Sequence, residues 1–248
     1  PRAAAGRIVF GQVFYGDYTI DPIFMITFFG ACFILYKGVR KLWGMFKPEG
    51  RLTVLGKTKA WYWHLLDVLI DEVVTHRKFD DCEAGPKTGT YVPNRKAGHM
   101  ILVYSFVILA FVTAVVALGH WGGKIIPLIK IETPMPLLYP VKILANLGAI
   151  MLVCGLAMLT ARRLKLNPKH QGSSWYDWYL LGIIWLVAVT GILSQVFRLA
   201  AIHPAFVVYY LHLVFVWMLF AYLPWSKLGH FVYRTAALLF VRMYGRGY

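Results

Sequence analysis

Hydrophobic residues are concentrated in five stretches of the chain, and each stretch is long enough to form a membrane-spanning helix. The stretches cover approximately residues 22–40, 98–118, 140–160, 178–197 and 204–223. An α-helix needs about 20 apolar residues to cross the ~30 Å hydrocarbon core of a bilayer. The stretches are apolar all round, whereas strands of a membrane barrel alternate in polarity over ~10 residues. The pattern therefore predicts an all-α integral membrane bundle of five transmembrane helices.

A long polar connection, residues 44–97, follows the first stretch. Its middle, residues 59–75, predicts an amphipathic helix with apolar residues at helical spacing, namely Trp61, Leu65, Leu69 and Val73. Acidic residues are concentrated in the same part of the chain, at Asp67, Asp71, Glu72, Asp80, Asp81 and Glu83. Two roles remain open, because this segment can lie on the bilayer or dock a cytoplasmic partner. The acids favour a partner, since acidic groups are unfavourable at an anionic membrane surface.

The composition agrees with a membrane protein. The chain has 248 residues, of which 59% are hydrophobic and 15% are charged, and a mean hydropathy of +0.59. A soluble domain carries about 25% charged residues. We therefore interpret residues 1–248 as a single transmembrane domain that contains the connection 44–97. The first residue is Pro1 and no signal peptide is visible, so we expect the chain to begin inside a longer product.

The positive charges are distributed unevenly between the two predicted sides of the membrane. Of the 26 Lys and Arg residues, 20 fall on the side that holds the connection 44–97 and the C-terminal tail, and 6 fall on the other side. The positive-inside rule then predicts an inner (cytoplasmic) membrane protein with its N-terminus outside and its C-terminus in the cytoplasm. The formal charge of +15 is explained by topology and anionic lipid, so we predict no nucleic-acid partner.

The cysteines exclude several metal centres. Cys32, Cys82 and Cys154 lie far apart and form no C-x-x-C or C-x-x-C-H motif. The sequence therefore argues against an iron–sulfur cluster, a zinc site or a covalently attached c-type haem held by this chain alone.

Four histidines form two pairs at matched depths. His212 and His230 are 18 residues apart, or five turns, so they share a face and lie ~27 Å apart if the fifth helix continues through Pro224. His99 lies at the start of the second stretch and His120 just beyond its end, ~31 Å apart. His99 is then level with His230, and His120 with His212. Facing imidazoles can bind a haem iron from both sides, although a membrane histidine also serves as an interhelical hydrogen-bonding group.

The junction of the fourth and fifth stretches carries a second candidate site. Gln195, Arg198 and His203 lie there and can donate hydrogen bonds to a quinone carbonyl. His203 is half a turn out of phase with His212, which favours a quinone or loop role over iron ligation. The alternative for Arg198 is a side chain that extends to interfacial water. The remaining histidines, His64, His76 and His170, are predicted to lie on the solvated surface.

The segment 212–230 resembles the last helix of the dihaem cytochrome b (gamma) subunit of respiratory nitrate reductase, in its His-to-His spacing and its Pro-aromatic-Ser-basic turn. Other motifs extend the likeness over nearly all of residues 20–243: Gly98-His99-Met100, Tyr176-Asp177-Trp178-Tyr179, Thr190-Gly191, Gln195 to Arg198 and Val232-Tyr233-Arg234-Thr235. With them, the chain resembles more specifically the membrane part of the C subunit of quinone-interacting membrane-bound oxidoreductase. That subunit is related to the cytochrome b subunit of heterodisulfide reductase.

The resemblance implies two haem b groups, with His99, His120, His212 and His230 as axial ligands. It also implies electron exchange between menaquinone and cytoplasmic flavin and iron–sulfur subunits in sulfur or sulfate metabolism, as part of anaerobic respiration. Two departures are visible. Leu109 stands where nitrate reductase gamma has its second histidine. We therefore take His120, in place of that histidine, as the ligand of the outer haem in this part of the chain. The N-terminal iron–sulfur domain of the quinone-interacting C subunit does not occur in this sequence.

Two other classes of protein fit the same hydrophobic pattern. One is a non-redox membrane anchor that docks soluble subunits, with its histidines acting between helices. The other is a small transporter or proton channel, although the internal repeats of many transporters are not evident here.

Overall fold

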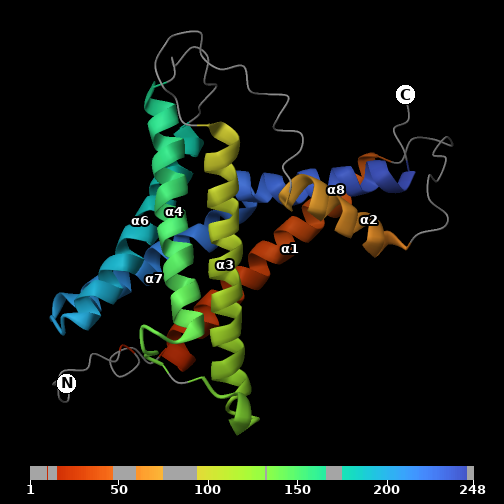
Figure 1. Ribbon diagram of the computed structural model, residues 1–248. Coiled ribbons are helices and arrows are strands. Elements are labelled where there is room, and N and C mark those ends of the chain that lie inside the picture. The colour runs from red at the N-terminus through yellow and green to blue at the C-terminus, as the bar shows by residue number, and fades with distance from the viewer. Residues whose placement is uncertain are drawn as a thin grey trace. The chain divides into compact units, whose positions relative to one another are not determined.

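The computed structural model describes residue 10 and residues 16–46, 60–74, 94–131, 133–165 and 175–244 (Figure 1). Of these residues, 89% are helical and none lies in a strand. Five helices are long and apolar enough to span a membrane, at Tyr18–Met45, Arg95–Gly122, Pro140–Lys165, Trp175–Leu199 and Pro204–Trp225. The predicted all-α membrane architecture with five spans is confirmed, and each helix extends a few residues beyond the predicted stretch.

The α-helices have the following bounds: α1 Asp21–Met45, α2 Trp61–Val68, α3 Arg95–Gly122, α4 Pro140–Lys165, α6 Trp175–Leu199, α7 Pro204–Tyr222 and α8 Lys227–Tyr244. Four shorter helical turns adjoin them: η3 Gly16–Ile20, η4 Leu69–Val74, η6 Pro127–Ile129 and η7 Leu223–Trp225. Local sequence explains several helix starts. Asp21 and Pro22 occupy the first turn of α1, and the Asn94 side chain accepts a hydrogen bond from the Ala97 N–H at the start of α3.

The chain divides into two compact units. The first contains residues 1–15, 83–173 and 181–215, and the second contains residues 16–82, 174–180 and 216–248. The first unit therefore holds α3, α4, most of α6 and the first part of α7. The second holds α1, α2, α8 and the remaining ends of α6 and α7.

In the first unit, α3 and α4 pack as an antiparallel pair through glycines (Figure 1). A Cβ added at Gly155 of α4 would lie 2.9 Å from the Leu102 backbone nitrogen of α3, and one at Gly148 would lie 3.0 Å from Leu109. On α3, every seventh residue is buried, at Gly98, Ser105, Val112 and Gly119. Gly98 lies against Met158 and Leu159 of α4, whereas Gly119 lies against Ile131 in the segment after α3. Small residues let the two backbones approach closely, which is how helices associate in a membrane.

In the same unit, hydrogen bonds connect α4 to α6 and α6 to α7. Trp185 Nε1 of α6 donates a 3.0 Å hydrogen bond to Thr160 Oγ1 of α4. His212 of α7 forms hydrogen bonds with α6 at Val187 and Thr190. Each of these helices thus has a defined neighbour within the unit, in the order α3, α4, α6 and α7.

In the second unit, α8 packs on the C-terminal end of α1. Trp43 Nε1 donates a hydrogen bond of 3.1 Å to the Ala236 carbonyl, and the Phe46 and Phe240 rings lie 5.2 Å apart. The end of α7 contacts α1 further along, where Trp217 Nε1 donates a 2.9 Å hydrogen bond to Thr27 Oγ1. The helix α2 packs on α8 (Figure 1).

The fifth span ends close to Pro224, as predicted, so the condition that would place His212 and His230 on one face of a continuous helix is not met. Helix α7 ends at Tyr222, a 3-10 turn covers Leu223–Trp225, and Ser226 is extended, with φ −91° and ψ 174°. Pro224 has no N–H to donate to a helical hydrogen bond, and the Ser226 side chain accepts a 3.1 Å hydrogen bond from the Leu228 N–H at the start of α8. His212 and His230 therefore belong to two separate helices, and the five-turn register does not apply to them.

The amphipathic segment is helical over Trp61–Val74, as α2 followed by the π-turn η4. The expected helix over residues 59–75 is therefore confirmed within a residue or two at each end. The acidic positions Asp80, Asp81 and Glu83 lie outside the described residues.

Candidate functional site

His212 lies on α7 and is held by α6 through one ring nitrogen. Its Nδ1 is 3.1 Å from the Val187 carbonyl oxygen and 3.2 Å from Thr190 Oγ1. The Thr190 hydroxyl donates its own proton to the Leu186 carbonyl one turn earlier on α6. Because a carbonyl oxygen only accepts, the Nδ1 of His212 carries the proton and donates it to Val187, with Thr190 Oγ1 as a second acceptor.

This hydrogen-bonding pattern determines the tautomer of His212. With the proton on Nδ1, the Nε2 atom keeps its lone pair and is the atom that can bind a metal. Metal-ligating histidines almost always donate their other N–H to a carbonyl or carboxylate, which orients the ring and raises the basicity of the ligand. His212 has this arrangement within α6 and α7, so it fits the role of an axial ligand.

Gly191 provides the space for the His212 ring. A Cβ at Gly191 would lie 3.0 Å from His212 Cε1 and 3.4 Å from Nδ1, tighter than an ordinary van der Waals contact. Because Gly191 has no side chain, the imidazole can lie against the α6 backbone next to Thr190. Thr190 thus positions the ring through a hydrogen bond with Nδ1, and Gly191 leaves room for the edge of the ring at Cε1.

His99 and His120 lie on one flank of α3. Each follows a buried glycine by one residue, since Gly98 and Gly119 both belong to the buried stripe of α3. One residue along an α-helix is a rotation of ~100°, so both histidines lie beside this stripe and on the same side of it. Both are half-buried.

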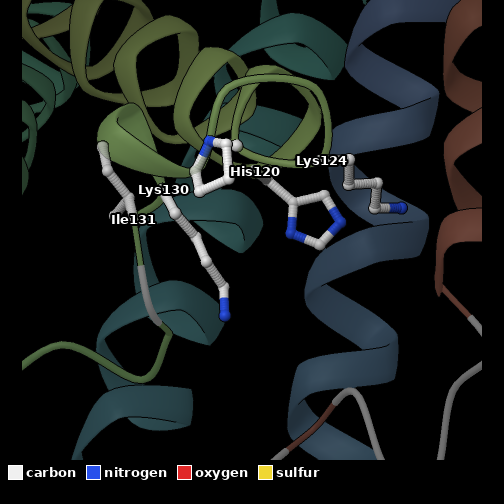
Figure 2. A pocket seen from close by; sticks show the side chains of 6 residues that line it. His120, Lys124, Lys130 and Ile131 are labelled. Carbon is white, nitrogen blue, oxygen red and sulfur yellow. The ribbon is translucent and has the colours of Figure 1, made fainter.

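His120 lies in the last turn of α3, inside the helix and not just beyond it as expected. It borders a pocket of about 380 Å³ that Figure 2 shows at the end of α3; the lining residues are His120, Gly123, Lys124, Pro127, Lys130 and Ile131. The Trp121 ring meets the His120 ring edge-on at 5.7 Å, and Lys124 Nζ lies 4.0 Å from the centre of the Trp121 ring. The surroundings of His120 are thus more polar and closer to the helix end than those of His212.

The four predicted haem ligands are placed differently by the structure. His212 is eight residues inside α7, or ~12 Å along its axis, whereas His120 is two residues, or ~3 Å, from the end of α3. His99 is four residues inside α3. His230 is exposed near the start of α8, which is not one of the five spans, and it belongs to the second unit.

The three predicted quinone residues gather where α6 meets α7. Gln195 and Arg198 are half-buried in the last two turns of α6, and His203 is exposed immediately before α7. The Arg198 carbonyl accepts a hydrogen bond from the Ala201 N–H in the connecting turn. This end of the first unit therefore combines hydrogen-bond donors with positive charge.

The acids of the amphipathic segment pair within the chain. Arg242 of α8 forms an ion pair with Asp71 and another with Asp67 at 3.7 Å. A third ion pair, 2.9 Å long, joins Lys227 of α8 to Asp177, which is buried at the start of α6. Asp67 and Asp71 are therefore already partnered, which weakens the hypothesis that they form an acidic docking surface. The side chain of Glu72 lies outside the described residues.

Sequence reasoning missed the roles of Val187, Thr190 and Asp177. Thr190 and Asp177 lie in motifs that carry the family resemblance, but a motif does not say which atom bonds to which. Thr190 and Asp177 are polar residues within apolar helix sequence, and buried polar groups need hydrogen-bonding or ionic partners. Their positions could therefore have indicated that each contacts another helix. No group of three or more His, Cys, Asp or Glu side chains forms a metal site among the described residues. A haem iron needs only axial ligands from the protein, and His212 can supply one.

Comparison with known proteins gives one match. The profile of a family described as citrate utilization protein B (CitB) matches residues 24–246. This family is not one of the cytochrome b subunits that the fifth stretch resembles, although its match is compatible with a membrane subunit. No curated protein and no solved structure matches the chain.

Proposed function

The chain belongs to the citrate utilization protein B family, and we propose that it is a membrane electron-transfer subunit with two haem b groups. It links the menaquinone pool to cytoplasmic flavin and iron–sulfur subunits. The observation that carries this proposal is His212, whose Nδ1 is held by α6 so that Nε2 is left for an axial bond. The likeness of segment 212–230 to the last helix of nitrate reductase gamma supports the same assignment.

The proposed ligands are His120 and His212 for the outer haem and His99 and His230 for the inner haem. A haem held by these imidazoles would supply one-electron oxidation and reduction. For His212, Val187 and Thr190 fix the tautomer and Gly191 leaves room for the ring.

The partner oxidoreductase is proposed to act in citrate utilization, as the description of the family states for its members. The resemblance to the quinone-interacting and heterodisulfide reductase subunits supports a second proposal, that it acts in sulfur or sulfate metabolism during anaerobic respiration. Loss of growth on citrate after deletion of the gene would favour the first proposal. Loss of growth by sulfur or sulfate respiration alone would favour the second.

An absorption spectrum tests the function directly. The purified chain should show a Soret band and α and β bands in a dithionite-reduced-minus-oxidised spectrum, with two haems per chain. Both rival classes, a non-redox anchor and a transporter or proton channel, predict no Soret band. A chain that folds in the membrane, is supplied with haem and stays colourless would therefore contradict the proposal.

Quinone is proposed to bind beside Gln195, Arg198 and His203. Arg198→Ala should raise the KM for a menaquinone analogue about tenfold, because one hydrogen bond to a bound group is worth ~0.5–1.5 kcal/mol. Haem content should stay unchanged. Stopped-flow reduction of haem by the quinol measures the effect, and Arg198→Lys should restore part of it. Unchanged kinetics in Arg198→Ala would place the quinone elsewhere.

The proposed orientation has the C-terminus in the cytoplasm and the N-terminus outside. A cysteine replacing Lys124, exposed after α3, should react with a membrane-impermeant maleimide in intact cells. A cysteine replacing the exposed Ala60, before α2, should react only after the membrane is permeabilised. The reverse labelling pattern would invert the topology.

A further inference from the structure

An apolar surface on α2 faces away from the rest of the second unit. We define the aromatic face as Tyr62, Trp63 and Leu66 of α2 together with Ile70 of the adjoining turn η4, which lie within about 100° of each other at α-helical spacing. Trp63 is 53% exposed and Ile70 is 52% exposed, and the other two are similarly accessible. On the other side of the helix, Val68 is 1% exposed. The helix thus presents a buried side within the unit and an apolar side that the described residues leave uncovered.

We propose that the aromatic face is a membrane anchor, inserted into the headgroup and upper acyl region of the bilayer. Helices that lie in this region carry Trp, Phe and Leu on the inserted face and sit ~5–10 Å into the boundary between headgroups and acyl chains. Tyr and Trp are enriched there because their rings are apolar and their N–H or O–H groups are polar. Two of the four residues of the aromatic face are Tyr62 and Trp63.

The packing of α8 places α2 near the end of a spanning helix. Trp43 and Phe46, at the C-terminal end of α1, contact Ala236 and Phe240 of α8. Helix α2 packs on the same α8. The span Tyr18–Met45 ends at this contact, where α1 carries the cations Lys37, Arg40 and Lys41. A helix that is packed on α8 is therefore within reach of the membrane surface that α1 leaves.

The ion pairs of Asp67 in α2 and Asp71 in η4 reduce the main objection to a lipid partner. Carboxylates are repelled by an anionic membrane surface. Asp67 and Asp71 are turned toward Arg242, and they lie outside the arc of the aromatic face. The sequence immediately before α2 adds two cations, Lys57 and Lys59, whose charge suits anionic headgroups. Charge and apolarity therefore favour lipid over a basic protein partner.

Spin labels test the proposal. Leu66 and Ile70 are each replaced by cysteine in a chain whose Cys32, Cys82 and Cys154 are replaced by alanine. The full-length chain is reconstituted in vesicles of phosphatidylethanolamine and phosphatidylglycerol without other subunits. Collisions with oxygen and with a water-soluble nickel chelate then give the depth of each label. Phe29→Cys, on the exposed surface of α1, is the control within the hydrocarbon core, and Lys124→Cys is the control in water.

We expect labels at both test positions to be shielded from nickel and to lie roughly 5–10 Å below the phosphate level. Labels that are as accessible to nickel as the one at position 124 would overturn the proposal. If such water-exposed labels become protected only when cytoplasmic partner subunits bind, the aromatic face is a protein docking surface instead. Gel filtration of each labelled variant verifies that it is folded before the measurement.

Discussion

Replacement of His212 by alanine should remove one of the two proposed haems, so that the haem-to-protein ratio falls by about half. The remaining haem should keep a normal reduced-minus-oxidised spectrum, because its ligands are proposed to be His99 and His230. The expected effect is large since an axial ligand has no substitute nearby: Val187 and Thr190 contribute only oxygen atoms to the His212 environment. Pyridine haemochrome analysis of the purified variant measures it.

Changes around His212 should have graded effects. Thr190→Val removes one of the two hydrogen-bond acceptors of His212 Nδ1 and leaves the Val187 carbonyl. Haem should then bind about tenfold more weakly, because loss of a hydrogen-bonding partner of a ligating histidine typically lowers affinity by about 10- to 100-fold. Gly191→Leu should displace the imidazole, because even a Cβ at this position would meet the ring at 3.0 Å. His203→Ala, at an exposed position outside α7, is the control and should keep both haems. A His212→Ala variant with its full haem content would show that His212 is not a ligand.

Replacement of Gly155 by alanine should destabilise the α3–α4 pair by ~1–3 kcal/mol, the usual cost of overpacking. The added Cβ would lie 2.9 Å from the Leu102 backbone nitrogen, and a backbone atom cannot move aside as a flexible side chain can. Leucine at the same position should be worse. Unfolding of the chain in mixed micelles with increasing SDS, followed by circular dichroism, measures the change.

Gly182 of α6 provides the matched control for that prediction. A Cβ there would meet nothing within 4 Å. Gly182→Ala should therefore be neutral or stabilising by up to about 1 kcal/mol, because alanine is the better helix former. Equal losses of stability in the two variants would mean that helix propensity, and not close packing of α3 on α4, determines the result.

The five spans were predictable because a membrane helix requires only length and apolarity, which are local properties of the sequence. The end of the fifth span near Pro224 was predictable too, but whether the helix continued beyond this residue was not. Pro224 was visible, but proline is tolerated inside many membrane helices, where neighbouring groups satisfy the freed carbonyl. The extended backbone of Ser226 and its cap on the Leu228 N–H break the helix here, and both depend on local hydrogen bonds that a hydrophobic pattern does not contain.

The candidate site was only partly predictable for a related reason. His212 stood out as an ionisable residue in an apolar stretch, yet its partners Val187 and Thr190 lie 22 to 25 residues earlier on another helix. Asp71 and its partner Arg242 are 171 residues apart. Periodicity relates residues within one helix, so it identifies which side chains need partners but not which distant side chains supply them.

The spacing of buried residues on α3 has a consequence for how this protein can change over evolution. Gly98, Ser105, Val112 and Gly119 form a heptad repeat, and helices that keep such a repeat wind around each other as a left-handed supercoil. His99 and His120 stay on one flank of this supercoil because they are three heptads apart. One inserted residue between them would rotate His120 by ~100° around α3, whereas seven would preserve its direction and move it ~10 Å along the axis. The separation of the two imidazoles can therefore change without loss of their common direction only in steps close to whole helical turns, so most other insertions and deletions in this part of α3 should be rare among functional variants.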